Sequence, residues 1–399
     1  MSVKSSMFFL EQKDEELDNY GISRGERKVF SRNLERLYRA IHDEKVIAYY
    51  IETDQDYDRV LDIFIRANDG GTKLTKSDLL LSMITSKWGG MNAREEIFGF
   101  VDYINNGLSR SNSFDKDFIM KSCLVLADLP VAYKVQNFTN ENLELIKKKW
   151  PEIKKAIKKG VDLINSYGID EQNLSSVNAV IPIIYFLYKN PSVDLLGSTP
   201  FEVRNSGYIH RWLFMALLKG AFGRAADGLL KNIRSNIKES GADFPLKEIN
   251  QTILSSGLHT TFDDDYIDDH VLSLNYGSKR VFLALSLLYD DARWGITPHH
   301  QDHIFATNLF KSGKLKAQDT LYGEEKKNNL VNLCLLPASE NTSKKDMPFS
   351  FWLESRDQSF LKRHLIPEDK SLWAFDRVSD FLDAREELIR LRLKSLFHP

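Results

Sequence analysis

The sequence predicts a mainly α-helical chain with one small strand-containing region near its C-terminus. Apolar residues recur every three or four positions in almost every segment between residues 92 and 290. Two short β-type runs at residues 301–305 and 332–336 break this pattern, and a long amphipathic stripe begins at Val378. We therefore expect helical N-terminal and middle regions, followed by a C-terminal domain of two strands capped by helices.

Composition is typical of a folded, soluble protein. The chain has 399 residues, 42% hydrophobic and 28% charged, which is enough for two or three domains with their own cores. Its two cysteines lie far apart in apolar surroundings, which excludes a disulfide framework and a cysteine-rich zinc site.

The apolar run near the N-terminus is too short for a signal peptide, and the longest uncharged apolar run, residues 179–188, is about half the length of a bilayer span. We expect that run to form a core helix, and the protein to be cytoplasmic without a membrane partner.

Charge is nearly balanced, with 54 basic and 56 acidic side chains and a net charge of −2. This balance excludes a uniformly basic nucleic-acid coat but not local patches. Residues 145–159 carry seven lysines, which indicate a solvated helix face or, as the alternative, a contact with a DNA backbone. Residues 263–269 carry five aspartates, whose spacing is not that of a calcium loop and is typical of a helix N-terminus and loop.

The first ninety residues indicate part of a mixed domain. Apolar spacing predicts a helix over residues 26–40, and the run VIAYYI at 46–51 predicts a short buried strand. The next helix should end at 68–71, because Asn-Asp-Gly-Gly is a strong helix stop. We expect three regions in the whole chain, at residues 1–90, 91–275 and 276–399.

Three of the nine histidines fall within five positions. His299, His300 and His303 surround Asp302 in the segment PHHQDHIF, at the first β-type run. An Asp-His pair alone is weak evidence for a site, because the chain also contains the pair at 269–270 with nothing comparable after it.

The downstream segment distinguishes the second Asp-His pair. Asn332 opens the second β-type run, and Asn341 opens a helix nine residues later, with Lys344 and Lys345 behind it. This order of residues has the spacing of a ββα-metal, or His-Asn-His (HNH), nuclease finger. A purely structural metal finger fits less well, because the available ligands are of the oxygen type and no thiol lies near a Cys-x-x-Cys spacing.

The residue types suit hydrolysis of a phosphodiester bond. A neutral imidazole can deprotonate water near neutral pH, so His303 is the candidate general base. A hard cation, Mg²⁺ or Mn²⁺, needs few oxygen ligands, and Asp302 and Asn341 are the candidates to hold it. We expect Asn332 to tie the two strands together and orient the backbone of His303, and Lys344 to steady the phosphate.

Other residues near this motif have open roles. His300 shares a strand face with Asp302, so it is an additional ligand, a DNA contact or a polar loop histidine, and the same holds for His299. Lysines gather between and after the motif residues, and we expect Lys314, Lys316 and Lys345 to contact DNA.

The sequence resembles the GmrSD-type modification-dependent (type IV) restriction endonucleases. In that family a ParB-like nucleotide-hydrolysing domain is followed by a helical region and an HNH-type nuclease domain. The similar stretches are DHIF at 302–305 with the segment 328–349, FIRANDGGTKLTKSDLL at 64–80, and the helical segment 209–233.

The resemblance implies a DNA endonuclease that cuts foreign, base-modified phage DNA as part of an antiviral restriction system. The family's ParB-like domain binds nucleotide at an Asp-Gly-Gln-Gln-Arg segment, which this sequence lacks. The resemblance therefore implies that residues 1–90 are the C-terminal remnant of a truncated ParB-like domain, and we do not expect this chain alone to hydrolyse nucleotide. A separate ParB-like NTPase subunit, or self-association, would then complete the enzyme. The alternative is a DNA-binding or regulatory subunit that is inactive without such a partner.

Overall fold

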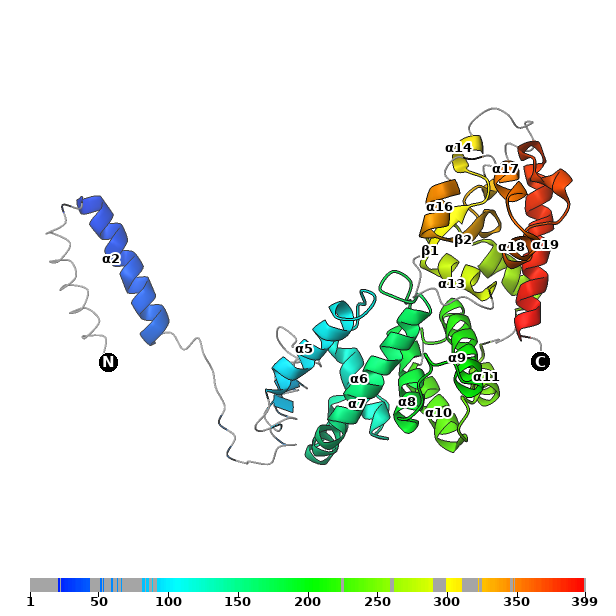
Figure 1. Cartoon of the computed structure of the whole chain (residues 1–399). Coiled ribbons are helices and arrows are strands. Elements are labelled where there is room, and N and C mark those ends of the chain that lie inside the picture. The colour runs from blue at the N-terminus through cyan, green and yellow to red at the C-terminus, as the bar shows by residue number, and fades with distance from the viewer. Residues whose placement is uncertain are drawn as a thin grey trace. The chain divides into compact units, whose positions relative to one another are not determined.

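A computed structural model gives the fold of the chain (Figure 1). It describes residues 21, 23–43, 51, 53, 59, 63, 66, 81–82, 84–85, 88, 92–223, 226–258, 262–289, 299–310, 322, 325–344, 347 and 349–397. The chain divides into two compact units, Met1–Lys73 and Leu74–Pro399. The described elements are mainly helical, which confirms the predicted class. No helix in the described ranges is long and apolar enough to cross a bilayer.

The first unit contains one described helix, α2 (Arg24–Tyr38), which continues into a π-helical turn at Arg39–Asp43. It begins at Ser23 because the side chains of Ser23 and Glu26 cap each other's backbone N–H groups. The helix predicted at residues 26–40 is therefore confirmed. The strand expected at 46–51 and the helix expected before residue 71 lie almost entirely outside the described residues.

The middle of the chain is an array of packed helices, as predicted. Its longer helices are α5 (Ala93–Asn106), α6 (Lys116–Leu126), α7 (Asn140–Ser166), α8 (Ile181–Lys189), α9 (Pro200–Leu218), α10 (Ala226–Glu239), α11 (Leu246–Ser255) and α13 (Lys279–Leu287). Shorter turns lie between them at Val135–Asn137, Val177–Val180, α12 (Asp264–Tyr266) and Ile267–Leu272.

Helix α8 is the centre of this array. Its residues from Ile181 to Leu187 are all buried, and it packs against α6, α7 and α10. Helices α7 and α8 approach closely at Gly160, where an added Cβ would lie 2.6 Å from Cγ1 of Ile184. The core helix predicted at residues 179–188 is thus confirmed, with Pro182 in its first turn, where a missing N–H costs nothing.

The C-terminal part holds a two-stranded antiparallel sheet of β1 (His299–His303) and β2 (Leu333–Pro337). Both predicted strands are confirmed with a shift of one or two residues. Helices α13, α16 and α19 lie around the sheet (Figure 1). The other C-terminal elements are α14 (Thr307–Phe310), the 3₁₀ turns Leu330–Asn332, Lys370–Trp373 and Phe375–Arg377, α16 (Ala338–Lys344), α17 (Phe349–Glu354), α18 (Gln358–Arg363) and α19 (Val378–Phe397).

The acidic segment at 263–269 is joined to helix α19. Asp263 caps α12 by accepting a hydrogen bond from the Tyr266 N–H at 2.8 Å, which confirms the predicted helix N-terminus. Arg390 of α19 pairs with Asp264 at 3.3 Å and with Asp268 at 2.6 Å. This cluster therefore acts as an internal counter-charge for α19.

Candidate active site

The end of β1 is fixed by the side chain of Asn332, which is fully buried. Its Oδ1 accepts from the Phe305 N–H at 2.9 Å, and its Nδ2 donates to the carbonyls of Phe305 at 3.0 Å and Lys327 at 2.7 Å. Its own carbonyl accepts from the Ile304 N–H at 2.8 Å. Asn332 therefore joins the chain after β1 to the turn before β2, next to Asp302 and His303.

His303 is held from one side of its ring. Its Nε2 lies 3.1 Å from Oδ1 of Asn328, an acceptor, so this contact favours the tautomer with hydrogen on Nε2 and leaves Nδ1 as the basic nitrogen. Burial lowers the pKa of His303, which keeps the imidazole neutral at neutral pH. The ring centroid of Tyr276 lies 4.9 Å from that of His303.

Lys344 lies beneath these residues rather than in solvent, and only 4% of its side chain is exposed. Its Nζ donates to Oδ2 of Asp302 at 2.5 Å and also to the carbonyl of His303, and it lies 5.0 Å from the ring centroid of Trp352. The structure thus pairs Lys344 with the proposed metal ligand, whereas its contact with a phosphate remains a prediction.

The donor types around Asp302 fit a hard divalent cation. Asp302 on β1 would supply carboxylate oxygens, and Asn341 on α16, which packs against both strands, would supply an amide oxygen. The prediction that Asn341 opens this helix is wrong, because α16 begins at Ala338. Lys344 already occupies one of the carboxylate oxygens. Among the described residues, no three His, Cys, Asp or Glu side chains come together to hold a metal ion. The fit is therefore to a cation such as Mg²⁺ that keeps several water or phosphate ligands.

A cavity of about 500 Å³ opens beside this motif. Both His300 and Asn341 line it, so the fold brings these two predicted residues to one surface. Its remaining walls come from three segments of the middle region and from β1: Arg110, Gly168, Asp170, Gln172, Asn173, Tyr276, Gly277, Ser278, Lys279, Phe282 and Gln301.

The structure does not describe the side chains of four residues that were predicted to belong to the site. Lys314, Lys316 and Lys345 lie outside the described residues. The backbone of His299 pairs with Pro337, but its side chain is not described. The roles expected for these residues remain predictions.

Sequence reasoning missed Arg385 of helix α19, which is fully buried. Its guanidinium donates to four backbone carbonyls, those of His364 at 3.2 Å, Leu333 at 2.9 Å, Leu330 at 3.4 Å and Val331. Three of these carbonyls flank Asn332. Burial lowers the pKa of Arg385. The available signal was its position on the apolar stripe of α19, four residues after Phe381 and four before Ile389.

Three of the seven lysines on the lysine-rich face of α7 make hydrogen bonds or ion pairs within the chain. Lys154 pairs with Glu96 at 2.6 Å and Lys158 with Asp162 at 2.6 Å. Lys159 donates to the carbonyls of Pro191 and Val193. These contacts favour the solvated, structural interpretation of this face over a DNA contact.

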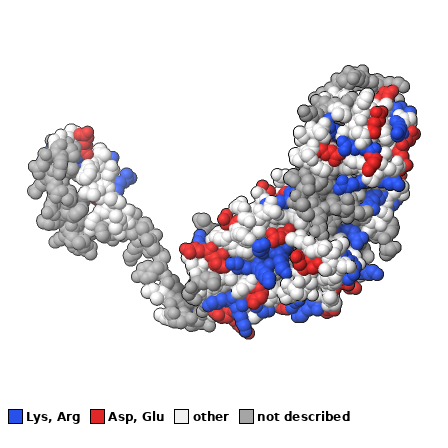
Figure 2. Space-filling view, viewed as in Figure 1, with Lys and Arg blue, Asp and Glu red and all other residues white. Residues whose placement is uncertain are grey.

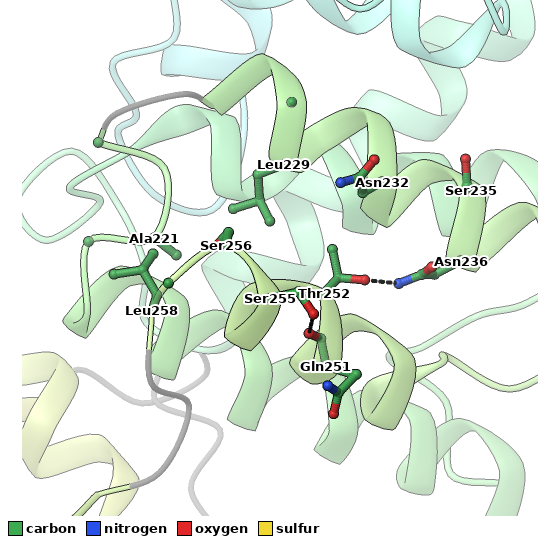
Figure 3. Close-up of a pocket in the computed structure, with 14 residues that line it drawn as sticks. Ala221, Leu229, Asn232, Ser235, Asn236, Gln251, Thr252, Ser255, Ser256 and Leu258 are labelled. Atoms are coloured by element: carbon green, nitrogen blue, oxygen red, sulfur yellow. Dashed lines mark hydrogen bonds between the residues drawn. The ribbon is translucent and has the colours of Figure 1, made fainter.

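A second cavity, of about 840 Å³, lies between α10, α11 and the turn after α9 (Figure 3). In the close-up, Nδ2 of Asn236 bonds Oγ1 of Thr252 at 2.6 Å across the gap between the two helices. The lining consists of glycine, alanine, leucine, serine, threonine, asparagine and glutamine. Among the described residues that line it, none has a titratable or aromatic side chain, so these residues offer no group for acid–base chemistry.

The class of protein is indicated by the N-terminal part of the chain. Residues 3–85 match a family model described as the N-terminal domain of GmrSD restriction endonuclease. The match indicates a function related to that of restriction endonucleases, with DNA as the substrate. A search of curated proteins found no match to the chain.

Proposed function

We propose that the chain is a metal-dependent DNA endonuclease of the HNH type that hydrolyses phosphodiester bonds in foreign, base-modified DNA. The observation that carries this proposal is the arrangement at the end of β1. There a half-buried, neutral His303 lies directly after Asp302, with Asn332 fixing the strand end and α16 packed alongside. The family match at residues 3–85 supports the restriction-related class.

In this proposal, Nδ1 of His303 takes a proton from the attacking water, while Asn328 holds Nε2 and so fixes the ring. Asn332 keeps the backbone at Ile304 and Phe305 in place through its hydrogen bonds. A bound Mg²⁺ or Mn²⁺, held by Asp302 and Asn341, would neutralise negative charge on the scissile phosphate.

A second candidate function is favoured by one observation. Lys344 already neutralises Asp302 in the structure. A chain in which the metal-binding carboxylate is paired in this way would serve as a DNA-binding or regulatory subunit, and would cut only after a separate NTP-hydrolysing ParB-like partner rearranges the site.

The test is nicking of phage DNA carrying modified cytosines, with unmodified DNA in parallel, in Mg²⁺, Mn²⁺ or EDTA. His303→Ala should reduce the nicking rate by about 10²-fold or more, the usual size of a general-base effect. The matched control is His270→Ala, because His270 also follows an aspartate but is exposed on another element. If His303→Ala nicked DNA at the same rate as His270→Ala, His303 would not be the general base. Binding without nicking, converted to nicking by an added partner, would favour the second candidate.

A further inference from the structure

We propose that the cavity beside His303 binds a single unstacked nucleotide of the DNA strand, with Tyr276 as its stacking platform. This inference rests on the proposed function, because it assigns the cavity to the substrate of the same site. It adds a nucleotide-binding pocket and a recognition residue to the residues that carry the hydrolysis.

The first argument is the position of Tyr276. Its N–H donates to the carbonyl of Asn328 at 2.7 Å, and the adjacent residues Asn275 and Asn329 form a β-bridge. The segment that bonds the His303 ring therefore also fixes Tyr276. The Tyr276 ring touches His303, yet the residue is 52% exposed and lines the cavity. An occupant stacked on Tyr276 would be separated from His303, the proposed general base, by the Tyr276 ring.

The second argument is the size and hydrogen-bonding character of the cavity. A volume of about 500 Å³ accommodates one nucleotide but not a duplex. Oε1 of Gln301, which lines the cavity, is buried and has no hydrogen-bond partner among the described residues. An unpaired buried acceptor is costly, so a donor from an occupant would stabilise it. The amino group of a nucleobase is such a donor.

The third argument is charge. Arg110 is neutralised by Asp170 at 2.7 Å, whereas the ammonium of Lys279 donates to a neutral group, the carbonyl of Glu171, at 3.3 Å. The described residues of the wall therefore carry one excess positive charge, which suits a group carrying one negative charge, such as a nucleotide with its phosphate. Aromatic, amide and basic side chains together are the combination by which proteins bind unstacked bases.

The larger cavity between α10 and α11 lacks this combination. None of its described lining residues is an aromatic side chain for stacking or a charged side chain for a phosphate. The pocket is therefore assigned to the smaller cavity, which also lies next to the proposed catalytic residues.

The experiment uses the full chain and duplexes in which 2-aminopurine replaces one base, moved position by position along the duplex, in EDTA so that no cleavage occurs. Unstacking of the probe raises its fluorescence. We expect a severalfold rise at one position with the wild type and with Tyr276→Phe, and none with Tyr276→Ala. Tyr276→Ala should also weaken binding about tenfold, the effect of one lost stacking contact. The matched control is Tyr103→Ala, since Tyr103 is 41% exposed on α5 and lies outside the cavity.

Binding of the duplex without a fluorescence rise at any position would overturn the nucleotide pocket and leave the proposed function standing. An equal rise with Tyr276→Ala and the wild type would overturn the role of Tyr276 as the platform. A complete absence of DNA binding would overturn the pocket together with the proposed function.

Discussion

The ion pair between Lys344 and Asp302 is the most consequential contact of single residues in the proposed site. Lys344 is almost fully buried, while 20% of the Asp302 side chain is exposed. Lys344 is therefore the more deeply buried partner, and part of the Asp302 side chain is accessible to solvent. Removal of either partner leaves the other charge poorly solvated, and this strongly destabilises the folded protein.

Lys344→Met should lower the free energy of unfolding by about 3 kcal/mol, because the Asp302 carboxylate loses its partner. The same change should increase the stabilisation by Mn²⁺, since the cation no longer competes with an ammonium for Asp302. The measurement is the shift in thermal unfolding midpoint on adding Mn²⁺, for the wild type and for the variant.

The double variant Lys344→Met/Asp302→Asn is the control for that shift. It has neither the lysine nor the carboxylate, so Mn²⁺ should leave its midpoint unchanged. If Mn²⁺ stabilised the wild type and both variants equally, Asp302 would not be a metal ligand.

At the scale of elements, local sequence signals predicted well where the pattern is regular. The two strands follow from short β-type runs, and α19 follows from the 3.6-residue spacing of its apolar residues. Five residues of the predicted stripe are buried, whereas two, Leu388 and Leu396, are half-buried; the buried ones are Val378, Phe381, Leu382, Ile389 and Leu393. Arg385 on the same face was missed because an arginine at that spacing is usually solvated. Its burial depends on carbonyls of the turn at Leu330–Asn332, which no pattern within α19 reveals.

Arg385→Met tests how α19 supports the site. The change keeps the length of the side chain but leaves the carbonyls around Asn332 without a donor, so we expect a loss of about 3 kcal/mol in the free energy of unfolding. Arg385→Lys should recover part of this loss, because one ammonium can serve fewer carbonyls. Urea unfolding measures the stability.

The local effect should appear in hydrogen exchange, with faster exchange of the amides in the turn at Leu330–Asn332 and at the start of β2. Arg377→Met provides the comparison, because Arg377 of the preceding 3₁₀ turn forms an exposed ion pair with Asp380, and the loss of such a pair should change neither measurement. Unchanged exchange in Arg385→Met would show that α19 does not position Asn332.

At the scale of the whole molecule, the site residues that sequence reasoning missed come from distant segments. Tyr276 and Asn328 reach His303 from 27 positions before it and 25 after it, and Arg110 lines the same cavity from the middle region. Such contacts between distant segments depend on the tertiary fold, so no local motif predicts them. The proposed motif could be predicted locally because its residues lie on β1, in the 3₁₀ turn that precedes β2, and on α16.

At this scale, the structure also shows how the charged side chains are distributed and paired. On the visible face, acidic and basic side chains are intermixed in the described parts of the chain (Figure 2). Much of the acidic segment at 263–269 pairs with α19, and part of the lysine face of α7 pairs with its own neighbours. Many charged side chains therefore neutralise one another within the chain, and the net charge does not describe the charge at the proposed site.

Stability of the whole chain should depend on pH through His210 in helix α9. His210 is half-buried, and its ring stacks on Phe214 with a centroid distance of 4.2 Å. Nε2 of the ring is fully buried and has no hydrogen-bond partner among the described residues. Burial lowers the pKa of His210 from 6.5 to about 4. Between these two values the unfolded chain binds a proton that the folded chain excludes, so stability is complete above pH 6.5 and falls as the pH drops toward 4.

His210→Leu should remove this dependence, because leucine fills a similar apolar space without titrating. The wild type should lose up to about 3 kcal/mol more than the variant between pH 7 and pH 4, which is the free-energy equivalent of the pKa difference. Urea unfolding at a series of pH values measures both proteins. Carboxylates shared by the two proteins contribute equally and cancel in the difference. Parallel curves for the wild type and the variant would show that His210 already carries its proton, or finds a partner for it, in the folded protein.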